Sequence, residues 1–283
     1  MQTPTSSARQ ILSSCLPLPL KQAARRVYDG WADRIFQPYL KRKNVEGVEF
    51  DFWIGDRDGR DWYDRDATDP VWPEMRFLRD HFVREGNVIF ECGGHHGCTA
   101  VFLSHCVGPG GRIITFEASP ANCDIIERNL RQNGLTNVQL ERKAVGATAG
   151  RIHITGASNA AVEISGQGRE VEMVPLDEFA SLTPSLLKID VEGFEIEVLR
   201  GASRILATLP RLAIEVHVSQ LAAFGSSAAT LFELINARAY RWWIQYGDVD
   251  EPTPYDPGKP LTDRCHLFGL PLEGKFALGF APA

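Results

Sequence analysis

Charged residues stand two apart in two segments that are otherwise apolar and strand-like. The run LLKIDVEG carries Lys188 and Asp190, and the run LAIEVH carries Glu215 and His217. Because side chains alternate along a strand, the two members of each pair face the same side of a sheet. Their burial is costly unless they are paired, so we expect Lys188 to pair with Glu215 and Asp190 with His217. This set is either a purely structural ion-pair network or the acid–base machinery of a catalyst.

A glycine-rich loop follows another apolar run, at residues 88–90. The loop reads ECGGHHG from Glu91 to Gly97, and its glycines, which include Gly93, do not form the GxGxxG pattern of dinucleotide sites. The acid at its start suits a cationic ligand such as S-adenosylmethionine and does not suit a pyrophosphate. Glu117 lies 20 residues beyond Gly97, the spacing at which a carboxylate accepts ribose hydroxyls. Together the two features predict a nucleoside-binding site.

The elements that would position these residues alternate between strands and helices. We expect strands at 88–90, 112–116, 138–142, 186–190, 212–217, 240–246 and 265–270, and helices at 74–84, 98–106, 120–133, 193–208 and 228–237. Residues 150–174 read as short antiparallel strands, and 248–264 as a loop. Such alternation predicts an α/β fold with a mainly parallel sheet that binds ligands at the carboxyl ends of its strands. The third strand then ends near residues 142–145, which include Ala144, and an adenine would rest there.

The N-terminal part is predicted to form a separate cover over the cleft. Residues 18–43 read as a helix, and 47–64 alternate and contain Asp58-Gly59, a hairpin signal. We therefore divide the chain into an N-terminal helical arm and hairpin, 1–73, and a main domain, 74–283.

Composition excludes several classes of protein. The chain has 283 residues, 44% of them apolar, and a net charge of −6, so a general polyanion-binding or nucleic-acid-binding role is not expected. No apolar run reaches about 18 residues, which argues against a transmembrane helix. The first 45 residues are basic, and we read them as a helical arm packed on the domain rather than a targeting segment.

Six cysteines occur without a CxxC pair, as expected of reduced thiols in a cytoplasmic protein. Cys92, His95, His96 and Cys98 have types that can ligate zinc. They lie in the glycine loop, however, whose backbone is needed for a ligand, so we predict no metal there.

The motifs together resemble the FkbM family of S-adenosylmethionine-dependent methyltransferases. The similarity covers roughly residues 74–220 and is carried by NVIFECGGHHG, ITFEASP, NLRQNGLTNVQLERKAVG and, above all, LLKIDVEGFEIEVLRGA. The chain departs from the family pattern at two positions, with Glu91 in place of Asp and His95 in place of Asn. The resemblance implies a class I methyltransferase, Rossmann-like fold, with seven strands of which the last is antiparallel.

The resemblance also implies roles for particular residues. Glu91, Gly93, Gly97, Glu117 and Ala144 would bind S-adenosylmethionine. Asp190, His217 and Lys188 would lie beside the transferred methyl group, with Asp190 favoured over His217 as the base. Related methyltransferases admit a divalent metal bridging Asp190, Glu192 and the substrate, and the sequence leaves metal dependence open.

The expected function is methylation of a hydroxyl on a sugar, glycan or secondary metabolite. Two alternatives remain: a non-enzymatic homologue that binds the cofactor, and an NAD-dependent oxidoreductase on a similar sheet. We expect a small-molecule or glycan acceptor, no nucleic acid and no integral membrane segment; the sequence leaves a homo-oligomer open.

Overall fold

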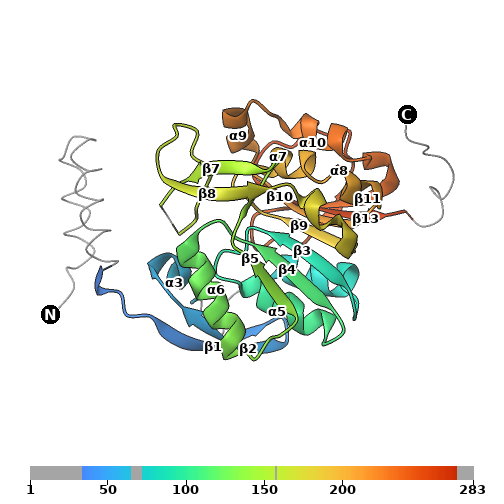
Figure 1. The fold of residues 1–283 in the computed structure, drawn as a ribbon. Helices are drawn as coiled ribbons and strands as arrows, with labels where there is room; N and C mark the ends of the chain where they lie inside the picture. Colours follow the sequence, from blue (N-terminus) through green and yellow to red (C-terminus); the bar gives the residue numbers. More distant parts are fainter. Residues whose placement is uncertain (1–33, 65–71, 157, 273–283) are drawn as a thin grey trace, which may run out of the picture.

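A computed structural model describes residues 34–64, 72–156 and 158–272 of the chain. Its centre is an eight-stranded sheet with the order β12-β11-β13-β10-β9-β3-β4-β5 (Figure 1). Five neighbouring strands run parallel: β5 (Val138–Glu141), β4 (Arg112–Phe116), β3 (Val88–Cys92), β9 (Leu186–Ile189) and β10 (Arg211–Val216). The crossover order of these strands brings the carboxyl ends of β3 and β9 side by side, where sequence reasoning placed the chemistry.

Antiparallel strands complete the other half of the sheet. β13 (Cys265–Pro271) lies between β10 and β11 (Tyr240–Tyr246) and runs antiparallel to both. This confirms the predicted α/β fold of mostly parallel strands with a final antiparallel one. The expected count of seven is too low, because β12 (Thr253–Tyr255) adds an edge strand inside the segment predicted to be a loop.

The central strands are buried on both faces, which explains their near-continuous apolar sequence. Leu187 and Ile189 of β9 belong to one hydrophobic cluster, and Leu186 belongs to the cluster on the opposite face. The first cluster is closed by η2 (Leu176–Leu182), α7 (Glu195–Arg200), α8 (Ser203–Ala207), α9 (Val218–Leu221), α10 (Ala228–Leu234) and η4 (Ala237–Ala239). The short turn η3 (Ala222–Phe224) follows α9 and contributes no buried residue. The second is closed by α4 (Pro73–Phe77), η1 (Leu78–Phe82), α5 (Cys98–Val107) and α6 (Pro120–Gln132).

Two of the predicted helices differ from expectation in detail. The helix expected over 193–208 is divided into α7 and α8 at Gly201. A Cβ atom on this glycine would lie 2.0 Å from the main-chain oxygen of Gly146, so the chain bends where the two backbones approach. The helix expected from residue 74 continues past α4 as the π-helical turn η1.

The N-terminal region differs most from the structure predicted from the sequence. The predicted helix 18–43 lies partly outside the described residues, and its last part is the strand β1 (Tyr39–Val45), paired with β2 (Val48–Ile54). Alternate side chains of β2, those of Phe50, Phe52 and Ile54, are buried in the cluster under α5 and α6. This burial stabilises the hairpin and outweighs the local helix propensity of the segment.

The predicted hairpin turn is also misplaced. Asp58 and Gly59 lie inside the helix α3 (Arg57–Tyr63), whose first turn is capped by Asp56: its carboxylate accepts the Gly59 N–H at 2.6 Å. The true hairpin turn is Glu46-Gly47. Because the hairpin shares the main hydrophobic core, it packs on the helical layer. Of the described residues up to position 73, those that line the cleft are Trp62 and Tyr63 of α3, and Trp72.

A small second sheet follows β5. It contains β6 (Ala144–Val145), β7 (Gly150–Ile154) and β8 (Arg169–Val174), with β8 in the middle, and η2 (Leu176–Leu182) leads from it back to β9. The expected antiparallel pairing is present between β7 and β8, while β6 pairs parallel with β8. No helix in the described parts of the chain is long and apolar enough to cross a membrane.

Candidate active site

Two cavities meet at the carboxyl ends of β3, β4, β9 and β10. We name the two cavities after the ligands that the sequence predicts. The nucleoside-side cavity lies between the glycine loop, the end of β4 and the small second sheet. The acceptor-side cavity, of about 380 Å³, lies between α3, Trp72 and the ends of β9, β10 and β13. Four residues line both cavities: His95, Asn159, Asp190 and Glu192. A group passing from one ligand to another would pass beside these side chains.

The glycine loop is shaped by its contact with β9. Gly93 has a φ of +90°, and a Cβ atom there would lie 1.8 Å from the main-chain oxygen of Asp190. The Asp190 N–H in turn donates to the main-chain oxygen of Cys92 at 2.9 Å. Only glycine fits this approach, so the loop fixes where Asp190 enters the site.

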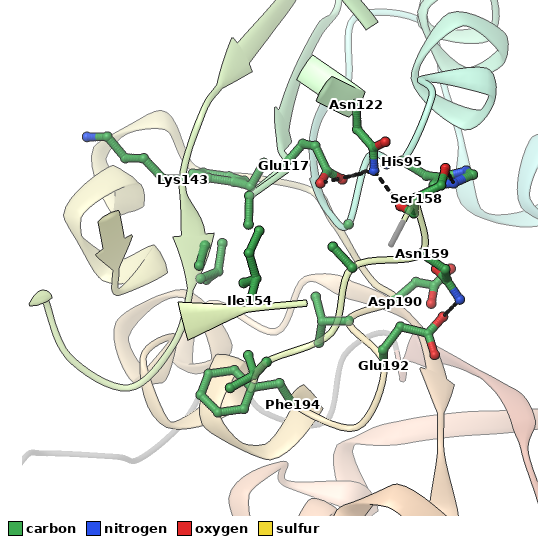
Figure 2. Close-up of a pocket in the computed structure, with 18 residues that line it drawn as sticks. His95, Glu117, Asn122, Lys143, Ile154, Ser158, Asn159, Asp190, Glu192 and Phe194 are labelled. Atoms are coloured by element: carbon green, nitrogen blue, oxygen red, sulfur yellow. Dashed lines mark hydrogen bonds between the residues drawn. The ribbon is translucent and has the colours of Figure 1, made fainter. Parts of the chain in front are cut away.

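Glu117, the predicted ribose ligand, lines the nucleoside-side cavity together with Asp190 and Glu192. It follows β4, and its two carboxylate oxygens accept the N–H groups of His95 and Ser119, each at 2.8 Å. Burial raises the pKa of this carboxyl, and the two backbone donors counteract that rise. Figure 2 shows the side chain extending toward Asn122, whose Nδ2 lies 3.4 Å from it. The carboxylate is therefore held in place before any ligand binds.

The far wall of this cavity is apolar. Ala144, the predicted adenine contact, lines it together with Val145, Ile154 and Phe194. Ile154 and Phe194 come from the small second sheet and the turn before α7 (Figure 2). Sequence reasoning missed them, as it missed Asn122, because only the tertiary fold brings these segments beside β4.

Two predicted cofactor residues lie outside the walls of both cavities. Glu91 is 1% exposed and lies in β3 opposite Lys188 and Thr115, and burial raises its pKa to about 7. Gly97, with a φ of +83°, starts α5 and packs against Ile126. Glu91 places a charge beneath the loop, and Gly97 shapes the helix start, so neither supports the predicted direct ligand contact.

Lys188 and Asp190, two members of the predicted acid–base set, contact each other. The Lys188 Nζ lies 3.8 Å from an Asp190 oxygen and 4.0 Å from Glu74. Burial opposes the charged ammonium, but these carboxylates outweigh it and raise the pKa of Lys188. Burial also raises the pKa of Asp190, and the nearby charge of Glu215 adds to the rise. Asp190 is thus a carboxylate with increased proton affinity.

His217 is held by other carboxylates than predicted. Its Nδ1 lies 2.8 Å from Glu195, and its Nε2 lies 3.4 Å from Glu192 and 3.6 Å from Glu215. Burial opposes protonation, but the Glu195 hydrogen bond and the surrounding acids raise the pKa of His217 to about 9.

The predicted pairs are therefore wrong in detail. Glu215 lies against His217, His266 and Arg264, and the direct contact of Lys188 on its own strand is Asp190. The sequence periodicity placed the residues on one face correctly, but it carried no information about Glu74, Glu195 and Arg264, which other elements supply.

Three of these groups lie close enough together to ligate one metal ion. One ligand atom each from Asp190, Glu192 and His217 lies within 4.8 Å of the others. The zinc candidates of the glycine loop are arranged differently: the rings of His95 and His96 stack at 4.1 Å and both face Ser158. Burial raises the pKa of Cys98 to about 12, which keeps it a thiol.

The acceptor-side cavity joins an aromatic wall to a polar one. Trp62, Tyr63 and Trp72 line it, and the last two rings stack with centroids 6.4 Å apart. Gln245 also lines this cavity. It is 1% exposed, and its Oε1 has no hydrogen-bond partner among the described residues. The Tyr63 hydroxyl contacts His95 Nδ1 at 2.7 Å, and burial lowers the pKa of His95 to about 3, so that ring is neutral.

Comparison with known proteins gives a family match. Residues 91–242, more than half of the chain, match the model described as the methyltransferase FkbM domain. The hexuronic acid methyltransferase AglP of Haloferax volcanii is 26% identical over 141 residues, which cover 47% of this chain and 57% of that protein. The chain therefore spans little more than half the length of this relative.

Among solved structures, methyltransferase FkbM from Methylobacillus flagellatus is 17% identical, with a TM-score of 0.48 over 69% of this chain and 48% of that one. An S-adenosylmethionine-dependent O-methyltransferase from Thermotoga maritima is 12% identical, with a TM-score of 0.44 over 83% and 79% of the two chains.

Proposed function

Since this chain belongs to the FkbM methyltransferase family, we propose that it transfers a methyl group from S-adenosylmethionine to a hydroxyl of a sugar, glycan or secondary metabolite. The observation that carries the proposal is the meeting of two cavities at Asp190 and Glu192. A nucleoside donor in one cavity and an acceptor in the other would have their reacting atoms at this junction.

The nucleoside-side cavity fits the donor. Glu117 offers the ribose a carboxylate that two backbone N–H groups already orient. Ala144, Ile154 and Phe194 offer an apolar wall for adenine. Asp190 and Glu192 give the end beside the acceptor cavity a negative field, which suits the cationic methionine part. When bound, the donor supplies an electrophilic methyl group and leaves as a neutral thioether.

Alignment is the main contribution expected of the protein. Holding two reactants in line can lower the barrier by about 7–11 kcal/mol. Asp190 is placed to take the hydroxyl proton, because its raised pKa makes it a stronger base than an ordinary carboxylate. Lys188, 3.8 Å from Asp190, orients that carboxylate. His217 is protonated at neutral pH and serves as a charged donor toward the acceptor oxygen rather than as the base.

The acceptor cavity suits a polyhydroxylated ring. Aromatic side chains pack against the apolar face of a sugar, and Gln245 leaves a buried acceptor atom for a hydroxyl. The name of the relative from Haloferax volcanii assigns that protein a hexuronic acid. In this proposal α3 contributes Trp62 and Tyr63 as the cover of the cleft.

Calorimetry with S-adenosylhomocysteine and, separately, NAD tests the donor class. We expect S-adenosylhomocysteine to bind at one site per chain and NAD to give no heat. Transfer of labelled methyl groups to a panel of glycosides then tests the acceptor class. A chain that binds neither S-adenosylmethionine nor S-adenosylhomocysteine would contradict the proposal, and binding without transfer to any hydroxyl would favour the non-enzymatic alternative.

A further inference from the structure

We propose that Asp190, Glu192 and His217 bind a divalent cation of the magnesium or manganese class at the junction of the two cavities. Their ligand atoms lie within 4.8 Å of one another. Two ligands on opposite sides of such an ion, each at about 2.1 Å, are about 4.2 Å apart, so small side-chain rotations close the site. Oxygen ligands with one imidazole suit these ions.

The buried carboxylate behind His217 supports this assignment independently of the cluster. Glu195 is fully buried, and its Oε1 contacts His217 Nδ1 at 2.8 Å and accepts the Gly193 N–H at 2.9 Å. A carboxylate that receives the second ring N–H is the usual support of a metal-binding histidine, because it fixes the tautomer and the orientation. It leaves His217 Nε2 directed at Glu192 and Glu215.

The balance of charge around the junction leaves a deficit of positive groups. Among the described residues that line the acceptor-side cavity or contact His217, the carboxylates are Glu74, Asp190, Glu192, Glu195, Glu215 and Asp248. The groups that can carry positive charge there are Lys188, His217, Arg264 and His266. Even with both imidazoles protonated, two carboxylates are unmatched. Glu195 Oε2 is also without a hydrogen-bond partner among the described residues.

The ion pairs show where positive charge is lacking. Arg264 pairs with Glu215 and Lys188 with Asp190. One of the two unmatched carboxylates is therefore at His217, whose single imidazole Glu192 and Glu195 share, and the other is at His266, which Glu74 and Asp248 share. A divalent ion would take the place of the proton on Nε2 of His217 and balance Glu192 and Glu195, so in the ion-bound chain the ion replaces His217 as the positive group facing the acceptor oxygen. At this position it would also stabilise negative charge on an acceptor oxygen; that role rests on the proposed methyl transfer, while binding of the ion does not.

Manganese titration of the full chain tests the site. After removal of metals with EDTA, electron paramagnetic resonance of free Mn²⁺ should show one ion bound per chain. Glu192→Gln and His217→Gln should each weaken binding at least tenfold, and Glu195→Gln by about 10–100-fold. Glu170→Gln is the matched control: it removes an exposed carboxylate on β8, outside both cavities, and should leave binding unchanged.

A second measurement needs no variant. Electron spin-echo modulation of Mn²⁺ bound to the unaltered chain should show a directly coordinated nitrogen, and His217→Gln should remove it. Absence of binding up to about 1 mM Mn²⁺, absence of nitrogen coupling, or equal binding by Glu192→Gln and the control would each overturn the site. A chain that binds Mn²⁺ but not S-adenosylhomocysteine would retain the metal site and lose the proposed function.

Discussion

Gly93 and Asp190 occupy adjacent strand ends so closely that a Cβ atom on the glycine would lie 1.8 Å from the aspartate main-chain oxygen. This contact joins the loop beside the nucleoside-side cavity to the residue that we assign as the base. Relief of a clash with backbone atoms requires one of the two strand ends to move.

Gly93→Ala should therefore lower the free energy of unfolding by more than the roughly 1–2 kcal/mol expected from a left-handed backbone alone. It should also weaken S-adenosylhomocysteine binding, because Asp190 and the loop move apart. Thermal unfolding and calorimetry measure the two effects. Gly134→Ala is the control: Gly134 has a φ of +61° with no atom within 4 Å of the added Cβ, so only strain is expected. Equal losses in both variants would refute the contact as the cause.

Glu117→Gln should weaken S-adenosylhomocysteine binding by about 10–100-fold. The neutral amide loses a charge-assisted hydrogen bond to the ribose, which is worth about 1.5–3 kcal/mol. Glu141→Gln changes a carboxylate at the end of the neighbouring strand β5, outside both cavities, and should bind normally. Normal calorimetric affinity in Glu117→Gln would remove this residue from the cofactor site.

Asp190→Asn should reduce the rate of methyl transfer by about 10²–10⁴-fold, because the amide cannot accept the acceptor proton. Binding of S-adenosylhomocysteine should change far less than the rate. Radiolabelled transfer under saturating donor, together with calorimetry, separates the two quantities. Undiminished turnover would rule out Asp190 as the base and leave the role to another group.

Stability should fall between about pH 6.5 and pH 9 because of His266. Burial opposes its charge, but Glu74, Asp248 and Glu215 outweigh burial and raise its pKa to about 9. Since the folded value lies above the unfolded value of about 6.5, the stabilisation is complete below pH 6.5 and lost as pH rises through 9.

Urea unfolding in EDTA at pH 6 and pH 9.5 measures this effect. The drop in free energy of unfolding should be smaller in His266→Gln than in the unaltered chain, by on the order of 1–3 kcal/mol. His217 titrates in the same window, so the comparison between the two chains isolates the His266 contribution. An identical drop in both would show that His266 is not charged in the folded state.

The sequence predicted the parallel core well because its signals are local. Apolar runs identified β3, β4, β9 and β10, and the helix expected over 120–133, ended by Asn133-Gly134, is α6. The sequence predicts a hairpin over 47–64, but it predicts a helix in place of β1 and a turn at Asp58-Gly59. The hairpin lies earlier in the chain because it is stabilised by burial under α5 and α6, a long-range effect.

The site was predicted in part for the same reason. Asp190, Glu117, Gly93 and Ala144 follow strands and line the cavities, as their position in the chain implies. The sequence did not mark Glu195 as a site residue, because an acid in the first turn of a helix is common. Only the fold shows that its carboxylate is fully buried against His217.

The two cavities share His95, Asn159, Asp190 and Glu192 in their common wall. Under the proposed function, a change at any of these positions would affect the binding of both ligands. Other residues line the acceptor-side cavity alone, among them Trp62, Trp72 and Val249, and changes there would alter acceptor selectivity without touching the nucleoside-side cavity. Redesign of selectivity should begin with those three positions.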